Sequence, residues 1–224
     1  MFRQTGKYPF ENLFCQGNEK RVNKTTMPET KKQKLLALYT RMRGKNLPLK
    51  DNAQHLVFGE GPGDAAVMLI GEAPGRKEDE LGRPFVGSAG RELNQLLAEA
   101  GLKRENVYIT SILKYRPSDN RNPRKPEIES HAPYLIEQIH IIEPEVLVPM
   151  GNFATRFLLS HFGVMRSKDI PGISSCRGYF YRLSVHGCPC KVLPVYHPAA
   201  ILYNRKLTRI MKTDFKKIKL RKGS

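Results

Sequence analysis

The stretch AAVMLIGEAPG, residues 65–75, decides the fold of this chain. Its first six residues are apolar, which is typical of a buried strand. The Gly-x-x-Pro-Gly sequence that follows ends the strand in a sharp loop with exposed backbone N–H groups and one carboxylate, that of Glu72. Because ligands of open α/β sheets bind at the carboxyl ends of the strands, we expect this loop to line a binding pocket.

A second apolar run, residues 192–196, leads into His197-Pro198-Ala199-Ala200. The proline suits the first turn of a helix, so the histidine lies where a strand ends and a helix begins. An isolated histidine is more often structural, but this position is a poor one for a core residue. Two loops of this type can face each other across one pocket.

The rest of the chain alternates apolar strand patterns with helical patterns. Such an alternation predicts parallel strands joined by helices that cover both faces of the sheet. We therefore expect an α/β fold, a three-layer α/β/α sandwich around a mostly parallel four-stranded sheet. The expected helices are residues 29–43, 88–100, 126–142, 152–161 and 206–219, and the expected strands are residues 65–70, 107–113 and 146–150 with a hairpin of 179–184 and 191–196. The glycine-rich run 59–63 precedes the first core strand instead of following it, which favours a turn over a dinucleotide-binding loop.

The length of 224 residues suits one domain with extensions. We expect residues 1–28 to form a loose basic extension and residues 29–224 to form one domain that ends in a basic helix, 205–224. No apolar stretch has the length of a membrane span, and residues 1–10 lack a signal-peptide pattern. We therefore expect an intracellular protein, cytoplasmic or nuclear, that is not secreted and does not bind membranes.

The net charge of +17 lies at the two ends of the chain. Residues 1–50 carry +9 and residues 205–224 carry +8, whereas residues 51–204 are neutral overall. Basic arms of this kind release counterions from a phosphate backbone, which indicates a nucleic-acid partner. Two alternatives stay open: a purely solubilising charge, or a membrane surface bound by the amphipathic segment 207–220.

Five strings occur in an order that points to one family. They are Gly71-Glu72-Ala73-Pro74-Gly75 with Glu78-Asp79, Gly82-Arg83-Pro84-Phe85-Val86-Gly87, Lys114-Tyr115-Arg116-Pro117, Asn120-Arg121-Asn122-Pro123 and His197-Pro198-Ala199-Ala200. At these residues the chain resembles the uracil-DNA glycosylase superfamily, most closely its family 4, over roughly residues 47–202. The resemblance implies a monofunctional DNA glycosylase for base excision repair, which flips a deaminated base out of single- or double-stranded DNA, hydrolyses the N-glycosidic bond of uracil and leaves an abasic site. We expect it to act as a monomer.

The resemblance implies two catalytic residues, Glu72 and His197. The loop of Glu72 would hold the attacking water, and His197 would donate to the O2 side of uracil as a neutral imidazole or as an imidazolium. From the residues alone, the Glu72 carboxylate could instead pair with Arg83 or Arg91.

Base binding would fall to Ala73 and Pro74 of the first loop, to Phe85 and to Ser111. Phe85 would stack on the flipped-out base, although an ordinary core role is also open. After Tyr108-Ile109-Thr110 the family has an asparagine that reads the N3–H and O4 edge of uracil, whereas this chain has Ser111. A hydroxyl is shorter and cannot donate and accept in the bidentate way of an amide, so base choice and rate depend on this residue.

We assign DNA contacts to Ser88, Arg121, Leu202 and Arg205. Leu202 and Tyr203 follow the His197 loop, where a wedge could fill the gap left by a flipped base. Core packing of Leu202 is the alternative.

Family 4 usually carries an iron–sulfur cluster held by four cysteines. The matching positions are Gly44, Leu47, Tyr115 and His131 here, so all four ligands are replaced together. We therefore expect no cluster, no other cofactor and no metal. The four cysteines of the chain, Cys176, Cys188 and Cys190 among them, are expected to be free thiols. A metal site at Cys188-Pro-Cys190 and His186 is the less favoured alternative.

Two other functions stay open. The fold could serve as a DNA-binding or processivity module with weak or no catalysis, which the lost cluster and Ser111 favour. It could also be a glycosylase with a shifted base specificity, for example for hypoxanthine.

Overall fold

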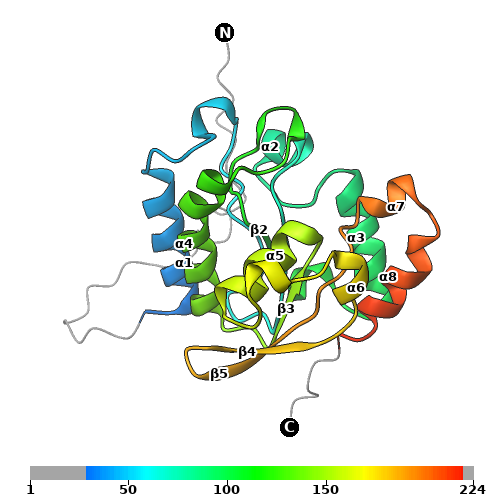
Figure 1. The fold of residues 1–224 in the computed structure, drawn as a ribbon. Helices are drawn as coiled ribbons and strands as arrows, with labels where there is room; N and C mark the ends of the chain where they lie inside the picture. Colours follow the sequence, from blue (N-terminus) through cyan, green and yellow to red (C-terminus); the bar gives the residue numbers. More distant parts are fainter. Residues whose placement is uncertain (1–28, 219–224) are drawn as a thin grey trace.

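The computed structural model describes residues 29–218, which form a five-stranded sheet with helices on both faces (Figure 1). The strand order is β2-β1-β3-β5-β4. The strands are β1 Val67–Gly71, β2 Tyr108–Ser111, β3 Val146–Pro149, β4 Tyr181–Val185 and β5 Cys188–Val192. The pairs β1–β2, β1–β3 and β3–β5 are parallel, and only β4 runs antiparallel to its neighbour.

The expected count of four strands was wrong by one. The segment 181–192 forms a tight hairpin, because His186 and Gly187 both take positive φ angles of 48° and 82° and turn the chain back on itself. Its second strand, β5, joins the parallel sheet, and its first strand, β4, adds an antiparallel edge. The α/β class and the mostly parallel sheet are confirmed.

The helices alternate with the strands as the sequence pattern predicts. They are α1 Lys31–Arg43, α2 Arg76–Leu81, α3 Ser88–Glu99, α4 Lys125–Ile142, α5 Asn152–His161, α6 Ile173–Cys176, α7 Ala200–Tyr203 and α8 Leu207–Phe215, with short 3-10 turns at Lys50–Asn52, Arg104–Asn106, Ser118–Asn120 and Ser167–Asp169. The expected basic C-terminal helix is shorter than predicted, since α8 ends at Phe215. Residues 1–28 and 219–224 lie outside the described part of the chain, and so do the structural predictions for them.

Successive side chains of a strand point to opposite faces of the sheet, so the sheet has a hydrophobic core on each face. Each core packs against a layer of helices, which gives three layers in all. In β1, Met68 and Ile70 contribute to the core formed with α1, α4 and α5, whereas Val67 and Leu69 contribute to the core formed with α3 and α8. Figure 1 shows α1 and α4 side by side, and α3 and α8 side by side in another part of the molecule. Within residues 29–218 no helix is long and apolar enough to cross a membrane.

The sheet brings the Gly-x-x-Pro-Gly loop after β1 and the His197 loop after β5 to the same edge. The chain continues beside β3 after β5 ends. The Gly151 N–H donates to the Val195 carbonyl at 2.9 Å, and Met150 forms a parallel bridge with Val195. Gly151 has φ of 94°, and a Cβ there would come within 3.3 Å of the His197 Cβ. His197 is thereby carried to the edge of the sheet at which β1 and β2 end.

Candidate functional site

A cavity of about 460 Å³ opens at the carboxyl ends of the parallel strands. It contains nine of the ten residues that the sequence analysis assigned to the site: Glu72, Ala73, Pro74, Phe85, Ser88, Ser111, Arg121, His197 and Leu202. These residues come from loops after β1, β2 and β5 and from the start of α3, so segments more than a hundred residues apart meet in one hollow. Their grouping is what the sheet topology predicts.

Arg205 is the exception. It lies between α7 and α8 with 80% of its side chain exposed, and its Nη1 atom is 3.7 Å from the Glu92 Oε1 atom on α3. Arg205 is not among the residues that line the cavity.

The His197 ring is partly buried beside the Phe85 ring, with 5.6 Å between the centroids. The Ala199 N–H donates to Nδ1 at 3.2 Å, so Nδ1 is an acceptor and the proton of the neutral ring is assigned to Nε2. Burial lowers the pKa of His197 to about 4, with the nearby Glu78 opposing the shift only in part. The lowered pKa favours the neutral ring at neutral pH over the imidazolium.

The Glu72 carboxylate is not held by the arginines that the sequence offered. Arg83 instead donates to Glu60, with 2.9 Å between Arg83 Nε and Glu60 Oε2. In the part of the chain that the structure describes, no salt bridge reaches Glu72. Burial raises the pKa of Glu72, because the charged carboxylate loses water. A half-buried, unpaired carboxylate in a cavity suits work on water.

The backbone of the first loop offers fewer donors than the resemblance suggests. Pro74 has no N–H group, so it can contribute only its ring and its carbonyl. Ala73 retains its N–H and lines the cavity beside Glu72. The Glu72 carbonyl accepts from the Leu113 N–H at 3.0 Å, which ties this loop to the chain after β2.

Phe85 combines a position in the core with a place in the lining of the cavity. It is only 7% exposed and belongs to the core on the α3 side of the sheet, yet its ring also lines the cavity. Ser111 lies next to it at the end of β2, paired with Gly71 of β1 and 3% exposed. The serine hydroxyl therefore stands at the floor of the cavity.

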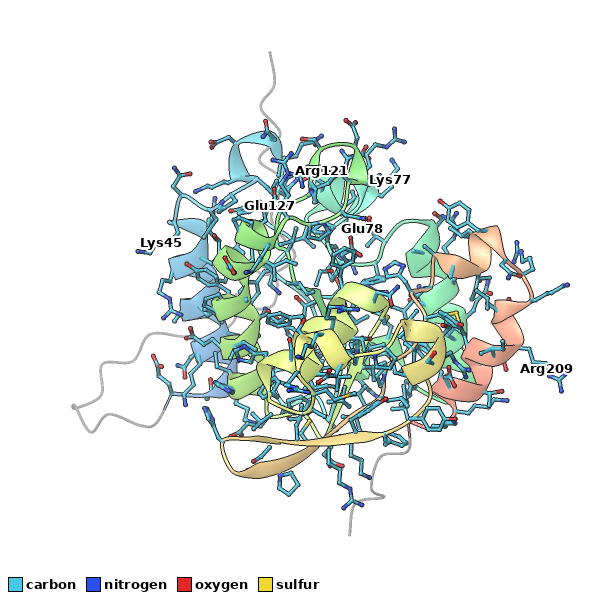
Figure 2. All side chains as sticks on the ribbon, in the orientation of Figure 1. Lys45, Lys77, Glu78, Arg121, Glu127 and Arg209 are labelled. Atoms are coloured by element: carbon cyan, nitrogen blue, oxygen red, sulfur yellow. The ribbon has the colours of Figure 1, made fainter. Side chains whose placement is uncertain are left out.

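The rim of the cavity is basic and partly aromatic. Arg121 forms a bidentate pair with Glu127, at 2.9 Å from Nη1 and 2.5 Å from Nη2, and this pairing lowers the pKa of Glu127. Leu202 is 42% exposed, while its neighbour Ile201 is buried and supplies the core contact, which argues against the core alternative for Leu202. Figure 2 shows Lys77, Glu78 and Arg121 on one side of the molecule, far from Arg209 on α8.

Sequence reasoning assigned no role to the charged residues Arg76, Lys77 and Glu78, which line this cavity. Arg76 and Lys77 begin α2 directly after the first loop. Tyr203, next to Leu202, is 91% exposed. Glu78 accepts from the Val86 and Gly87 N–H groups, both at 2.8 Å. The two basic residues could have been predicted from their position directly after the Gly-x-x-Pro-Gly loop. The contact of Glu78 with the loop eight residues later could not, because it forms only in the folded chain.

The positions of the family 4 cluster do not fit an iron–sulfur group here. Such clusters are held by cysteine thiolates, and none of the four positions is a cysteine. Among the four residues, His131 is the usual kind of metal ligand, but both of its ring nitrogens already make hydrogen bonds. Nδ1 accepts from the Lys114 N–H at 3.0 Å, and Nε2 lies 3.1 Å from the Pro48 carbonyl oxygen. Its ring packs edge-on against Tyr115, and burial lowers its pKa to about 4.

The cysteines form no alternative metal site within residues 29–218. Cys176, Cys188 and Cys190 are free, and no group of three or more histidine, cysteine or acidic side chains in these residues could hold a metal. His186 instead stacks on His140 of α4, with ring centroids 3.9 Å apart.

Comparison with known proteins agrees with this site. The family model described as the uracil DNA glycosylase superfamily matches residues 58–220. The chain is 41% identical over 177 residues to the type-4 uracil-DNA glycosylase of Archaeoglobus fulgidus, which covers 79% of this chain and 87% of that protein. It is 44% identical over 164 residues to the type-4 enzyme of Sulfurisphaera tokodaii, covering 73% of each, and 33% identical over 126 residues to the type-5 uracil-DNA glycosylase of Thermus thermophilus, covering 50% of this chain and 57% of that protein.

This chain belongs to the uracil-DNA glycosylase superfamily. Two of its relatives, at 41% and 44% identity, are named type-4 uracil-DNA glycosylases, as the five sequence strings predict.

Proposed function

We propose that this protein is a monofunctional DNA glycosylase that hydrolyses the N-glycosidic bond of uracil in DNA and leaves an abasic site for base excision repair. The observation that carries this function is the meeting of Glu72, Phe85 and His197 in one cavity at the carboxyl ends of the strands. The function also agrees with the names of the relatives, which are uracil-DNA glycosylases.

Cleavage of this bond leaves negative charge on the departing base and positive charge on the sugar. A preorganised donor lowers the barrier most when it points at the atom on which charge develops. The Nε2–H group of His197 is such a donor, directed at uracil O2. Because the Ala199 N–H fixes the ring from the opposite nitrogen, His197 needs little rearrangement during the reaction.

Glu72 orients the attacking water in this proposal. Its carboxylate is half-buried and free of salt bridges in the described residues, so its lone pairs are available to a water molecule in the cavity. Ala73 supplies a backbone N–H to the base, Pro74 and Ser111 border it, and Phe85 provides the aromatic surface on which it stacks.

The substrate is DNA, single- or double-stranded, and we propose that the protein acts on it inside the cell as a monomer. Arg76, Lys77 and Arg121 lie at the mouth of the cavity, where they can contact phosphates. Ser88 opens α3 beside them, and the exposed Leu202 and Tyr203 can enter the base stack in place of the flipped nucleotide. Arg205, exposed and outside the cavity, would contact DNA only beyond the flipped nucleotide.

We propose further that the enzyme works without an iron–sulfur cluster or any other cofactor. Gly44, Leu47, Tyr115 and His131 offer no thiolate, and hydrogen bonds to Pro48 and Lys114 occupy the His131 ring. Iron and acid-labile sulfide measured in anaerobically purified protein should be absent at stoichiometric level, and excess chelator should leave the activity unchanged. Stoichiometric iron, or activity that disappears with chelator and returns with metal, would contradict this proposal.

A shifted base specificity is the second candidate, and Ser111 is the observation that favours it. The hydroxyl stands where a base-reading amide is expected, so discrimination at the N3 and O4 edge of uracil is weaker. Oligonucleotides that carry one uracil, hypoxanthine or xanthine, treated with the protein and then with alkali, separate the candidates. Strand cleavage at uracil supports the proposed function, cleavage at hypoxanthine alone supports the second candidate, and no cleavage at any lesion favours a non-catalytic DNA-binding module.

A further inference from the structure

The loop that carries Phe85 has an unfavourable backbone conformation. Phe85 has φ of 49°, in the left-handed region that non-glycine residues rarely adopt. Its ring lies so close over Gly71 that a Cβ at that glycine would come within 2.7 Å of the Phe85 Cζ atom. Because strained residues persist only where their surroundings fix them, the contacts of this loop identify the residues that place the ring.

Arg104, at the start of the short 3-10 turn before β2, holds the loop through its carbonyl groups. Its Nη2 donates to the Pro84 carbonyl at 2.7 Å, and its Nη1 is 3.2 Å from the Phe85 carbonyl oxygen. The remaining N–H groups donate to Glu60 Oε1, at 2.9 Å from Nε and 2.6 Å from Nη2, and to Asn94 Oδ1 at 2.9 Å from Nη1. All five N–H donors of the guanidinium therefore have an acceptor, an arrangement that no other side chain can reproduce.

The glycine-rich run 59–63 anchors this arginine. The Glu60 backbone exchanges two hydrogen bonds with Ile109 of β2, at 2.9 and 2.8 Å, so its carboxylate is fixed relative to the sheet. Gly61 has φ of 132°, and a Cβ there would lie 2.2 Å from the Val107 carbonyl oxygen. The glycines therefore allow the turn to pack closely against the sheet, which places the Glu60 carboxylate next to Arg104.

The loop is fixed from its other side as well. The Glu78 Oε1 atom accepts from the N–H groups of Val86 and Gly87. On α3, a Cβ at Gly90 would lie 1.9 Å from the Phe85 carbonyl oxygen, so only glycine allows the helix to pack there. Arg104 therefore binds the carbonyl groups of Pro84 and Phe85, and Glu78 binds the N–H groups of the two residues that follow Phe85.

We propose that Arg104, anchored by Glu60, is a positioning residue for base recognition. It holds the left-handed backbone of Phe85 and thereby the ring on which the flipped base stacks. Arg104 does not line the cavity, so its effect passes through Phe85. The inference rests on the proposed function and on the stacking role of Phe85.

A double-mutant cycle tests this inference. The rate constant for uracil excision is measured in single turnover, with folded enzyme in saturating excess over the DNA, for the parent, Arg104→Gln, Phe85→Ala and the double variant. Because the enzyme saturates the substrate, a small unfolded fraction leaves the rate constant unchanged. We expect Arg104→Gln to lower the rate constant by on the order of 10–10²-fold, as for a misplaced binding group. In the Phe85→Ala background the same change should have little further effect, because the ring through which it acts is gone.

Arg83→Gln is the matched control. Arg83 donates to the same Glu60 carboxylate but to neither carbonyl of the Phe85 loop, so this variant should keep the rate constant of the parent. Glu60→Gln, which weakens the anchor and leaves the guanidinium in place, should show a smaller loss than Arg104→Gln, and it replaces Arg104→Gln in the cycle if that variant does not fold.

The outcomes separate this inference from the proposed function. A parent that releases no uracil contradicts the proposed function. With an active parent, an unchanged rate constant in Arg104→Gln overturns the inference, and so do losses that multiply fully in the double variant. An unchanged rate constant in Phe85→Ala also overturns it, because no ring position would then matter.

Discussion

The protonation state of His197 depends on one neighbour, the Ala199 N–H group, and on burial. The Ala199 N–H occupies Nδ1, and loss of water lowers the pKa to about 4, so the ring carries no charge at neutral pH. A neutral donor stabilises charge on the leaving base through a fixed hydrogen bond. The sequence indicated the histidine but not its charge, because a pKa depends on burial, which only the fold supplies.

The pH dependence of the excision rate follows from these two pKa shifts. The pKa of Glu72 is raised and that of His197 is lowered, so on acidification from neutral pH the Glu72 carboxylate is the first of the two to be protonated. We expect a single-turnover rate constant that is level around neutral pH and falls with acidification, with a midpoint above the ordinary value for a glutamate of about 4.3. A rate that rises as the pH falls toward the ordinary histidine pKa would indicate an imidazolium donor and contradict this assignment.

We expect Ser111 to limit how selectively the protein recognises the N3 and O4 edge of uracil. It is buried at the floor of the cavity beside Gly71, where a longer amide could reach a base that a hydroxyl contacts only through water. We expect Ser111→Asn to raise the single-turnover rate constant on uracil and to increase the preference for uracil over hypoxanthine. A lower rate on uracil would show that the serine is adapted to its own cavity.

At the scale of elements, most of the fold could be predicted from apolar periodicity. Helix α5 has the predicted bounds, and α3 and β1 differ from theirs by one or two residues. The hairpin strand β4 was predicted as a segment, but its place as a fifth strand of the same sheet was not, because pairing with an existing sheet is not specified by the hairpin's own sequence.

The contacts that shape the site could not be predicted for a related reason. The hydrogen bonds of Arg104 and Glu78 join residues that are distant in the sequence and face each other only in the folded chain. Lys114 is a clear example: a basic residue in a polar string is fully buried, with its Nζ 2.6 Å from Gln138 Oε1, and burial lowers its pKa. Charge in a sequence usually predicts a solvated side chain.

His131 joins two loops where the relatives of family 4 are expected to hold a cluster. Replacing it would leave the Pro48 carbonyl and the Lys114 N–H without their partner. We expect His131→Ala to lower the free energy of unfolding in urea by about 1–3 kcal/mol, the cost of unsatisfied buried groups. His161→Ala, an exposed histidine on α5, is the control and should change little. Equal stability of the His131 variant and the parent would mean that this pair of hydrogen bonds does not hold the loops.

At the scale of the whole molecule, the basic ends of the chain divide into a structural part and a removable part. Met211 and Phe215 of α8 are buried in the core, so this helix cannot be removed without damage to the fold. Residues 1–28 and 219–224 each carry a net charge of +3. We expect deletion of both segments to weaken duplex binding and to reduce the slope of log K against log salt by about 0.9 for each phosphate that the shortened protein no longer neutralises. An unchanged slope would assign these charges to solubility.

The most direct test of the account is the release of free uracil from DNA by the parent and by His197→Ala. A duplex with one uracil is incubated in single turnover with excess chelator, and the free base and the abasic site are both quantified. We predict equimolar uracil and abasic sites from the parent, and a rate constant lowered by about 10²–10³-fold in His197→Ala with unchanged affinity for abasic DNA. No free uracil from the parent, or equal rate constants for the two proteins, would contradict the account.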